Sequence, residues 1–283
     1  MNGNRPGSEN HVLVRAGVGI AVLASIIGAF IGSGAAGGTP ISEAAGGWLS
    51  TGATPLAPDT AAFRVWSIIY VGLIGYGLWQ FSASARTSGR QRNLRPWAIA
   101  SALLNALWVW TIQWDTLSLS VVVIAVLLLV LIRMLLLISA ERPRSRMEAV
   151  LTDGTFGLYL GWVSVATAAN IAAWLGALGA EGFSAWVPAA VAVLVVIAVL
   201  GVSLAGWTRG RIAPALTIAW GLSWISVART DGDFASDALV WTAGLSAAAV
   251  LSAAVLLRWK FRAHHALGGS RTASAFRRRD SRK

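Results

Sequence analysis

The class of fold is decided by residues 117–138, which read LSLSVVVIAVLLLVLIRMLLLI. A helix needs roughly 20 predominantly apolar residues to cross a bilayer, and this segment is long enough. Its apolar residues are continuous rather than alternating with a period of two, which argues against a strand of a membrane barrel. We therefore predict a transmembrane helix over 117–138.

Outward from this segment, the chain repeats the same kind of apolar stretch in both directions. Of its 283 residues, 56% are hydrophobic and 12% are charged, whereas soluble domains are nearer a quarter charged. The composition predicts an all-α fold, a polytopic transmembrane helical bundle of about eight spans. The predicted spans are 12–34, 62–82, 96–114, 117–138, 156–178, 185–207, 212–229 and 238–258.

The net charge of +11 follows the predicted topology. If the N-terminus is cytoplasmic, all but three of the 23 Lys and Arg residues fall in cytoplasmic segments or tails, the exceptions being Arg64, Arg133 and Arg229. The positive-inside rule explains this asymmetry, so the charge does not require a nucleic-acid partner. We expect an integral protein of the bacterial inner (plasma) membrane with both termini inside.

Three segments lie outside the predicted spans and differ in composition. Residues 1–11 form a cytoplasmic N-terminus, and residues 35–60 form a long external loop rich in Gly, Ala, Thr and Pro. Loops of this length often act as lids or binding loops. Residues 261–283 are basic and of low complexity, which predicts a disordered cytoplasmic tail that could also touch anionic lipid.

The residue types needed for most catalytic chemistry are missing from the predicted spans. The chain has no cysteine, its 12 acidic residues fall in loops or tails, and its three histidines are His11, His264 and His265, near the ends. Proton relays, acid–base catalysis and metal sites depend on such groups. We therefore expect no required cofactor and do not favour an enzyme.

Tryptophan is unusually frequent, with 15 residues in the chain. Most of them are explained by the aromatic belts at the two membrane interfaces. Five lie deeper in their predicted spans, and the belts do not explain them: Trp108, Trp110, Trp162, Trp220 and Trp224.

Helical spacing places several aromatic residues on the same face as an amide or a small residue. An asparagine buried in a membrane must find a partner, either on another helix or in a ligand. Three such faces together favour the walls of one cavity for a flat apolar ligand. The faces are Phe63, Trp66 and Tyr70; Ser101, Asn105 and Trp108; and Tyr159, Trp162, Ala166 and Asn170.

Three of these segments resemble the TspO/MBR family of tryptophan-rich sensory proteins and translocator proteins. Residues 63–70 (FRVWSIIY) are similar to the family's F-x-P-V-W-T-x-L-Y, and residues 104–108 (LNALW) to its L-N-x-x-W. Residues 159–170 (YLGWVSVATAAN) are similar to Y-L-x-W-V-x-F-A-T-x-L-N. The resemblance covers about residues 12–178, but the external loop lacks the family's W-x-P-P-x-W segment.

The resemblance implies a five-helix bundle over 12–178, with a ligand pocket beneath the external loop. Residues 179–260 would then add three transmembrane helices, and a chain truncated after Gly179 should still fold. Porphyrin or haem is implied as a ligand, sterols bind to some members, and a homodimer is left open. The ligand-binding residues that we expect are Trp66, Asn105, Trp108, Tyr159, Trp162, Ala166, Ala169 and Asn170.

Three functions remain open at this point. The leading hypothesis is a membrane-embedded binding protein or sensor for a planar hydrophobic ligand, a porphyrin, tetrapyrrole or sterol, acting in its transport or regulation. The alternatives are a transporter of a small amphiphilic molecule or lipid, and a structural membrane protein. The resemblance also leaves one enzymatic role, light- or oxygen-dependent porphyrin breakdown.

Overall fold

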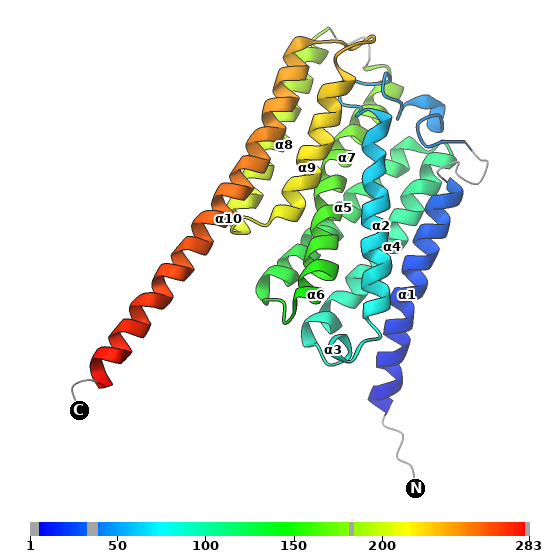
Figure 1. Cartoon of the computed structure of the whole chain (residues 1–283). Helices are drawn as coiled ribbons and strands as arrows, with labels where there is room; N and C mark the ends of the chain where they lie inside the picture. Colours follow the sequence, from blue (N-terminus) through cyan, green and yellow to red (C-terminus); the bar gives the residue numbers. More distant parts are fainter. Residues whose placement is uncertain (1–5, 33–38, 181–183, 281–283) are drawn as a thin grey trace.

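The structure, a computed structural model, describes residues 6–32, 39–180 and 184–280, and the side chains of 13–28, 39–180 and 184–263. Over these residues the chain forms helices and turns without strands (Figure 1), which confirms the all-α prediction. Five long helices make a first bundle: α1 (Pro6–Gly32), α2 (Val65–Trp79), α4 (Gly89–Gln113), α5 (Leu117–Ala140) and α7 (Thr155–Ala177).

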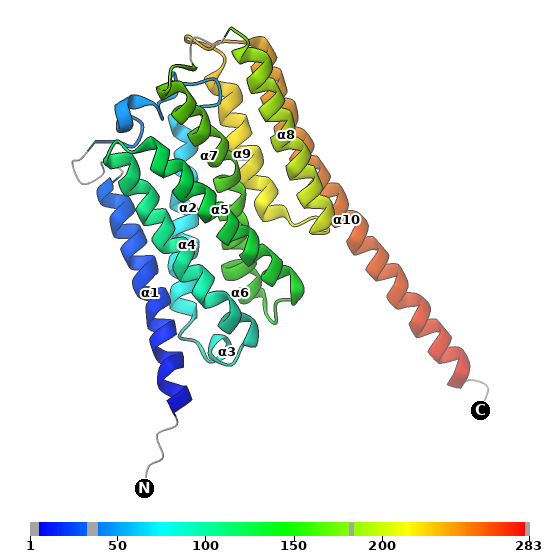
Figure 2. The same ribbon diagram turned by 180° about the vertical axis from the view of Figure 1, so that it is seen from behind.

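Three more long helices stand beside this bundle (Figures 1 and 2). They are α8 (Trp186–Trp207), α9 (Ile212–Ala228) and α10 (Asp237–Asp280). Short elements join the long ones: η1 (Ala45–Gly47), η2 (Thr60–Arg64), α3 (Ala83–Arg86), α6 (Arg146–Glu148) and the π-helical segment η3 (Ala149–Gly154).

Five of the helical segments are long and apolar enough to cross a membrane, and they include α2, α5, α7, α8 and α10. Helices α1 and α9 contain shorter apolar stretches. Helix α4 is different because arginines occupy its first turns and Asn105 interrupts its apolar part. It also begins earlier than the predicted 96, since Ser88 caps it by accepting a hydrogen bond from the backbone N–H of Gln91.

The predicted tail, residues 261–283, overlaps the end of helix α10, and its residues 281–283 lie outside the described residues. Helix α10 continues beyond the predicted span to Asp280 and leaves the bundle at an angle (Figure 1). The segment contains no proline and is rich in alanine and arginine, which are strong helix formers. A segment of low complexity can therefore still consist of residues that favour a helix.

The described part of the chain begins and ends at the same end of the molecule. Helix α1 begins, and α10 ends, on the side where α3 and α6 are found (Figure 1). The segment between α1 and α2 lies at the opposite end (Figure 1). We call its described part, residues 39–64, the roof loop; residues 35–38 of the predicted external loop lie outside the described residues.

Each group of helices has its own core. The core of the first bundle contains aromatic residues from several helices, among them Tyr76, Trp108 and Trp162, whereas the core around α8–α10 is aliphatic. Many large apolar side chains remain exposed on the outer faces, including Leu129, Leu200 and Leu245. A membrane protein presents such faces to lipid.

Helices α7 and α9 join the two groups by close packing. A Cβ on Gly161 of α7 would overlap with the carbonyl oxygen of Pro214 and the hydroxyl of Thr217. The Thr217 hydroxyl donates a hydrogen bond to the carbonyl oxygen of Leu158 at 2.7 Å. Small residues at an interface let two membrane helices approach and hydrogen-bond in this way.

Candidate ligand-binding site

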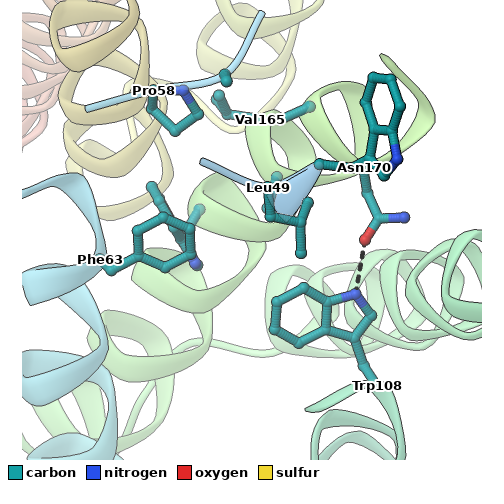
Figure 3. Close-up of a pocket in the computed structure, with 11 residues that line it drawn as sticks. Leu49, Pro58, Phe63, Trp108, Val165 and Asn170 are labelled. Atoms are coloured by element: carbon teal, nitrogen blue, oxygen red, sulfur yellow. Dashed lines mark hydrogen bonds between the residues drawn. The ribbon is translucent and has the colours of Figure 1, made fainter. Parts of the chain in front are cut away.

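The roof loop closes the external end of the first bundle. It inserts Leu49 and Ala57, which are both buried, among the ends of the helices. The Asp59 side chain accepts a hydrogen bond from the backbone N–H of Ala61 at 2.8 Å and so starts the short helix η2. Leu49 lies between Phe63 and Trp108 (Figure 3).

A small cavity of about 30 Å³ lies directly beneath the roof loop (Figure 3). A cavity needs on the order of 10–15 Å³ of such space to hold one water molecule, so this one has room for a few waters at most. It is lined by Trp48, Leu49, Ala57, Pro58, Phe63, Trp108, Trp162, Val165, Ala166, Ala169 and Asn170.

A larger cavity of about 370 Å³ lies between α1, α2, α4 and the start of the roof loop. Its volume is within the range of roughly 300–1,000 Å³ that is usual for small-molecule sites. It is lined by Ile26, Pro40, Ile41, Ser42, Thr60, Phe63, Trp66, Ser67, Tyr70, Trp108 and Val109.

Phe63 and Trp108 border both cavities and therefore separate them. The residues that were expected to line one cavity are divided between these two cavities. Trp162, Ala166, Ala169 and Asn170 line the small cavity with Trp108, whereas Trp66 lines the large one. Asn105 and Tyr159 line neither cavity.

The two predicted asparagines bind other helices. Asn170 accepts a hydrogen bond from the indole Nε1 of Trp108 and donates one from Nδ2 to Ser120 Oγ, each at 2.8 Å. Asn105 Nδ2 donates to Ser25 Oγ at 3.1 Å and to the Tyr70 hydroxyl at 3.0 Å. Both amides therefore fix the wall residues of the cavities in place.

The aromatic rings between α2 and α7 form one continuous cluster. Trp66 stacks on Tyr70 with 5.3 Å between ring centroids, and its edge contacts Tyr159 and Trp162 at 5.6 and 6.4 Å. Phe63 meets Trp162 edge to face at 5.7 Å. The Tyr159 hydroxyl donates to the carbonyl oxygen of Ser101 at 3.2 Å. Tyr159 thus supports the rings that line the cavities.

Helix α9 and the residue after it hold the roof loop, which sequence reasoning missed. Trp220 Nε1 donates to the carbonyl oxygen of Ala62 at 2.9 Å, and the backbone N–H of Asp59 donates to the carbonyl oxygen of Trp224 at 3.2 Å. The aromatic belts left Trp220 and Trp224 unexplained. Their presence deep in the predicted span was the sequence feature that could have indicated a contact with the loop.

Arg229 completes this anchor. Its guanidinium donates to the carbonyl oxygen of Thr54 at 3.0 Å and to that of Thr51. Burial lowers the pKa of Arg229, and the carboxylate of Asp231 opposes that shift. Arginine nevertheless stays charged in proteins, so two roof carbonyls receive charge-assisted hydrogen bonds.

The opposite end of the bundle contains buried charged side chains. Their burial was not predicted, because the sequence places the acidic residues in loops or tails. Arg90 pairs with Glu148 at 3.2 Å and with Asp153 at 2.5 Å, and Arg211 pairs with Asp153 at 2.9 Å. Arg90 and Glu148 are each only 2% exposed. The network joins α4, the π-helical segment before α7 and the start of α9. Within the residues that the structure describes, no group of three or more acidic or histidine side chains could hold a metal ion.

One of three comparisons with known proteins found a match. No curated protein and no solved structure matches the chain. A family model described as TSPO-like protein matches residues 19–257. This match extends well beyond residues 12–178, to which the motif resemblance was confined, and takes in α8, α9 and the membrane part of α10. The chain is an integral membrane protein and belongs to the TSPO-like family.

Proposed function

We propose that this protein binds a planar, hydrophobic ligand within the membrane, a porphyrin or a sterol, and takes part in its transport or in signalling its presence. The observation that carries the proposal is the aromatic partition of Phe63 and Trp108 between the two cavities. A flat ligand that displaces the Phe63 ring from this partition gains both cavities and a continuous aromatic surface.

The energetic basis is burial of apolar area. Transfer of such area from water contributes on the order of 25 cal/mol per Å² before the costs of ordering are subtracted. The small cavity of about 30 Å³ is too small for a tetrapyrrole. Binding therefore starts in the larger cavity, and movement of the Phe63 ring then opens the smaller one. Trp108 keeps its hydrogen bond to Asn170 during this movement.

Titration of intrinsic tryptophan fluorescence with protoporphyrin IX tests the proposal on the full chain in mild detergent. Ala166→Phe fills the small cavity, and Val109→Phe fills the large one. Each should weaken binding at least about tenfold, whereas Trp259→Phe on the exposed face of α10 should leave binding unchanged. If both cavity variants bind as tightly as the parent protein, the proposed site is wrong.

The proposal includes a metal-independent mode of binding. Every histidine lies near an end of the sequence, so an axial histidine ligand for iron is not expected from the bundle. Metal-free protoporphyrin should therefore bind about as tightly as haem in the same titration. A strong preference for haem would point to iron ligation instead.

We also propose that the protein sits in a bacterial inner membrane with both termini in the cytoplasm. The basic segments cluster on one side of the predicted spans, and α1 begins at the same end of the molecule at which α10 ends (Figure 1). Reporter fusions at Gly52 and Gly232 should be external, and a fusion at the C-terminus should be cytoplasmic. An external C-terminal reporter would reverse the assignment.

A further inference from the structure

An open groove of about 360 Å³ lies between α5 and α8, two helices that both face the viewer in Figure 2. Helix α5 forms one wall with Ile132 and Leu136, and α8 forms the other with Leu200 and Leu204. Helix α5 packs on α4 and α7, whereas α8 packs on α9 and α10. The space therefore lies where the two groups of helices meet, and we call it the lateral groove.

The lateral groove is apolar at its walls and at its floor. Leu160 of α7 and Ile218 of α9 line it and are only 2% and 3% exposed, whereas Leu200 on the wall is 63% exposed. The groove is thus open on its outer side and closed at its base. Ser164 also lines it, but its Oγ donates a hydrogen bond to the carbonyl oxygen of Leu160 at 2.8 Å. The lining therefore favours a hydrocarbon occupant.

The surroundings supply such an occupant. The hydrocarbon region of a bilayer contains no water that could fill the groove. If the groove were empty, the atoms of its lining would lose van der Waals contacts on one side. A lipid acyl chain is flexible and can enter from the open side without movement of the helices.

An arginine lies at one end of the lateral groove. Trp207 lines the groove at the end of α8, and Arg211 follows in the turn before α9. The Arg211 guanidinium donates to Asp153 Oδ2 at 2.9 Å and to the carbonyl oxygen of Ile138, near the end of α5, at 3.3 Å. It thus spans from the start of α9 to the wall formed by α5. Its side chain is 25% exposed, and these two bonds leave several of its five N–H donors for a further acceptor.

Positive charge is in excess around this arginine. Asp153 is shared between Arg211 and Arg90, and Arg90 also pairs with Glu148, so these four charges cancel. Arg258 of α10 is close enough to Arg211 for the two like charges to repel each other. Within the part of the chain that the structure describes, Arg258 forms no ion pair. Basic sites between transmembrane helices bind anionic lipid headgroups in this way.

We propose that the lateral groove holds an acyl chain of one anionic phospholipid, whose phosphate accepts hydrogen bonds from Arg211. The chain lies against Leu160 and Ile218 and fills the space between the two groups of helices. The site does not depend on the proposed function, because none of the groove residues lines either cavity beneath the roof loop.

Native mass spectrometry of the full chain tests the proposal. The protein is released from detergent micelles that contain equal amounts of POPG, an anionic phospholipid, and POPC, a zwitterionic one with the same acyl chains. We expect one tightly retained lipid per chain and a preference for POPG on the order of fivefold, as one arginine near a phosphate provides. Equal retention of the two lipids, or no retained lipid, would overturn the proposal.

Two variants with aromatic substitutions locate the acyl chain. Ser164→Phe places a ring on the floor of the groove and should abolish retention of both lipids. Val199→Phe is the matched control, because Val199 is 58% exposed on α8 and does not line the groove, so retention should equal that of the parent. Circular dichroism checks that both variants are helical. A folded Ser164→Phe protein that retains POPG as the parent does would show that the lipid lies elsewhere.

Two variants of Arg211 test the headgroup contact. Arg211→Gln removes the charge and should retain POPG and POPC equally, whereas Arg211→Lys keeps the charge and should still prefer POPG. If Ser164→Phe does not fold, this pair decides. A preference for POPG that is unchanged in Arg211→Gln would contradict the proposed phosphate contact.

Discussion

The first bundle and the group α8–α10 use different side chains for the same task of packing helices in a membrane. The first core mixes large aromatics with buried polar groups such as Asn105 and Asn170, which fix the rings by hydrogen bonds. The second core is built from alanine and branched aliphatic residues, for example Ala243 and Leu194. The first kind of core presents fixed ring faces and hydrogen-bonding groups, whereas the second is filled by aliphatic side chains.

This difference does not make the two groups independent. The group α8–α10 contacts the first bundle through α9, which packs on α7 and ends at the roof loop. We infer that α8–α10 contribute to ligand binding by holding the roof loop and not by lining the two cavities beneath it. Three experiments test this division of roles, from the largest expected effect to the smallest.

Removal of α8–α10 should have the largest effect. The resemblance suggested that a chain ending after Gly179 would fold, but the structure predicts the opposite outcome. Truncation leaves Gly161 without its packing partner on α9, and Asp153 without Arg211. We expect loss of the helical circular dichroism signal and of porphyrin binding. A stable truncated protein that binds the porphyrin would make the first bundle self-sufficient.

Separation of α7 from α9 by one methyl group should have an intermediate effect. In Gly161→Ala the added Cβ meets Pro214 and Thr217, and such overpacking costs roughly 1–3 kcal/mol. The melting temperature in detergent should fall accordingly. Gly206→Ala on α8 is the matched control, because a Cβ there would have no neighbour within 4 Å. Equal melting temperatures for the two variants would contradict close packing between α7 and α9.

Loss of the Arg229 anchor should have the smallest and most local effect. The chain has no cysteine, so a single Ala169→Cys change places one thiol beside the small cavity. In that background Arg229→Gln should raise the rate of maleimide labelling about tenfold, which corresponds to about 1.4 kcal/mol of easier roof opening. The melting temperature should change little.

The control for this experiment is Arg209→Gln, which removes the same charge from an exposed side chain between α8 and α9. Its labelling rate should match that of the parent. If Arg229→Gln also labels at the parent rate, then the roof loop is held by its other contacts, with Trp220 and Trp224 as the next residues to change.

The sequence predicted what depends on local periodicity. Apolar length located the long helices, and i, i+4 spacing correctly grouped Trp66 with Tyr70 and Trp162 with Ala166 on inward faces. These features follow from helix geometry and need no knowledge of the fold.

Contacts between distant segments could not be predicted in this way. Nothing near Arg229 indicates that its partners are roof carbonyls at Thr51 and Thr54, because backbone acceptors leave no signature in a sequence. Glu148 lies in a polar loop that looks solvated, yet the loop folds back and buries it beside Arg90. The partition by Phe63 and Trp108 was also missed, since shared faces do not specify how far each ring extends.

The anchor of the roof loop has a consequence for how the protein is made. Thr51 and its partner Arg229 are separated by 178 residues of chain. At about 5–20 residues per second of synthesis, a ribosome needs roughly 9–36 seconds to reach the arginine after making the threonine. During that interval the roof loop lacks its contacts with α9 and with Arg229. The loop can therefore be fixed over the first bundle only after synthesis has passed α9.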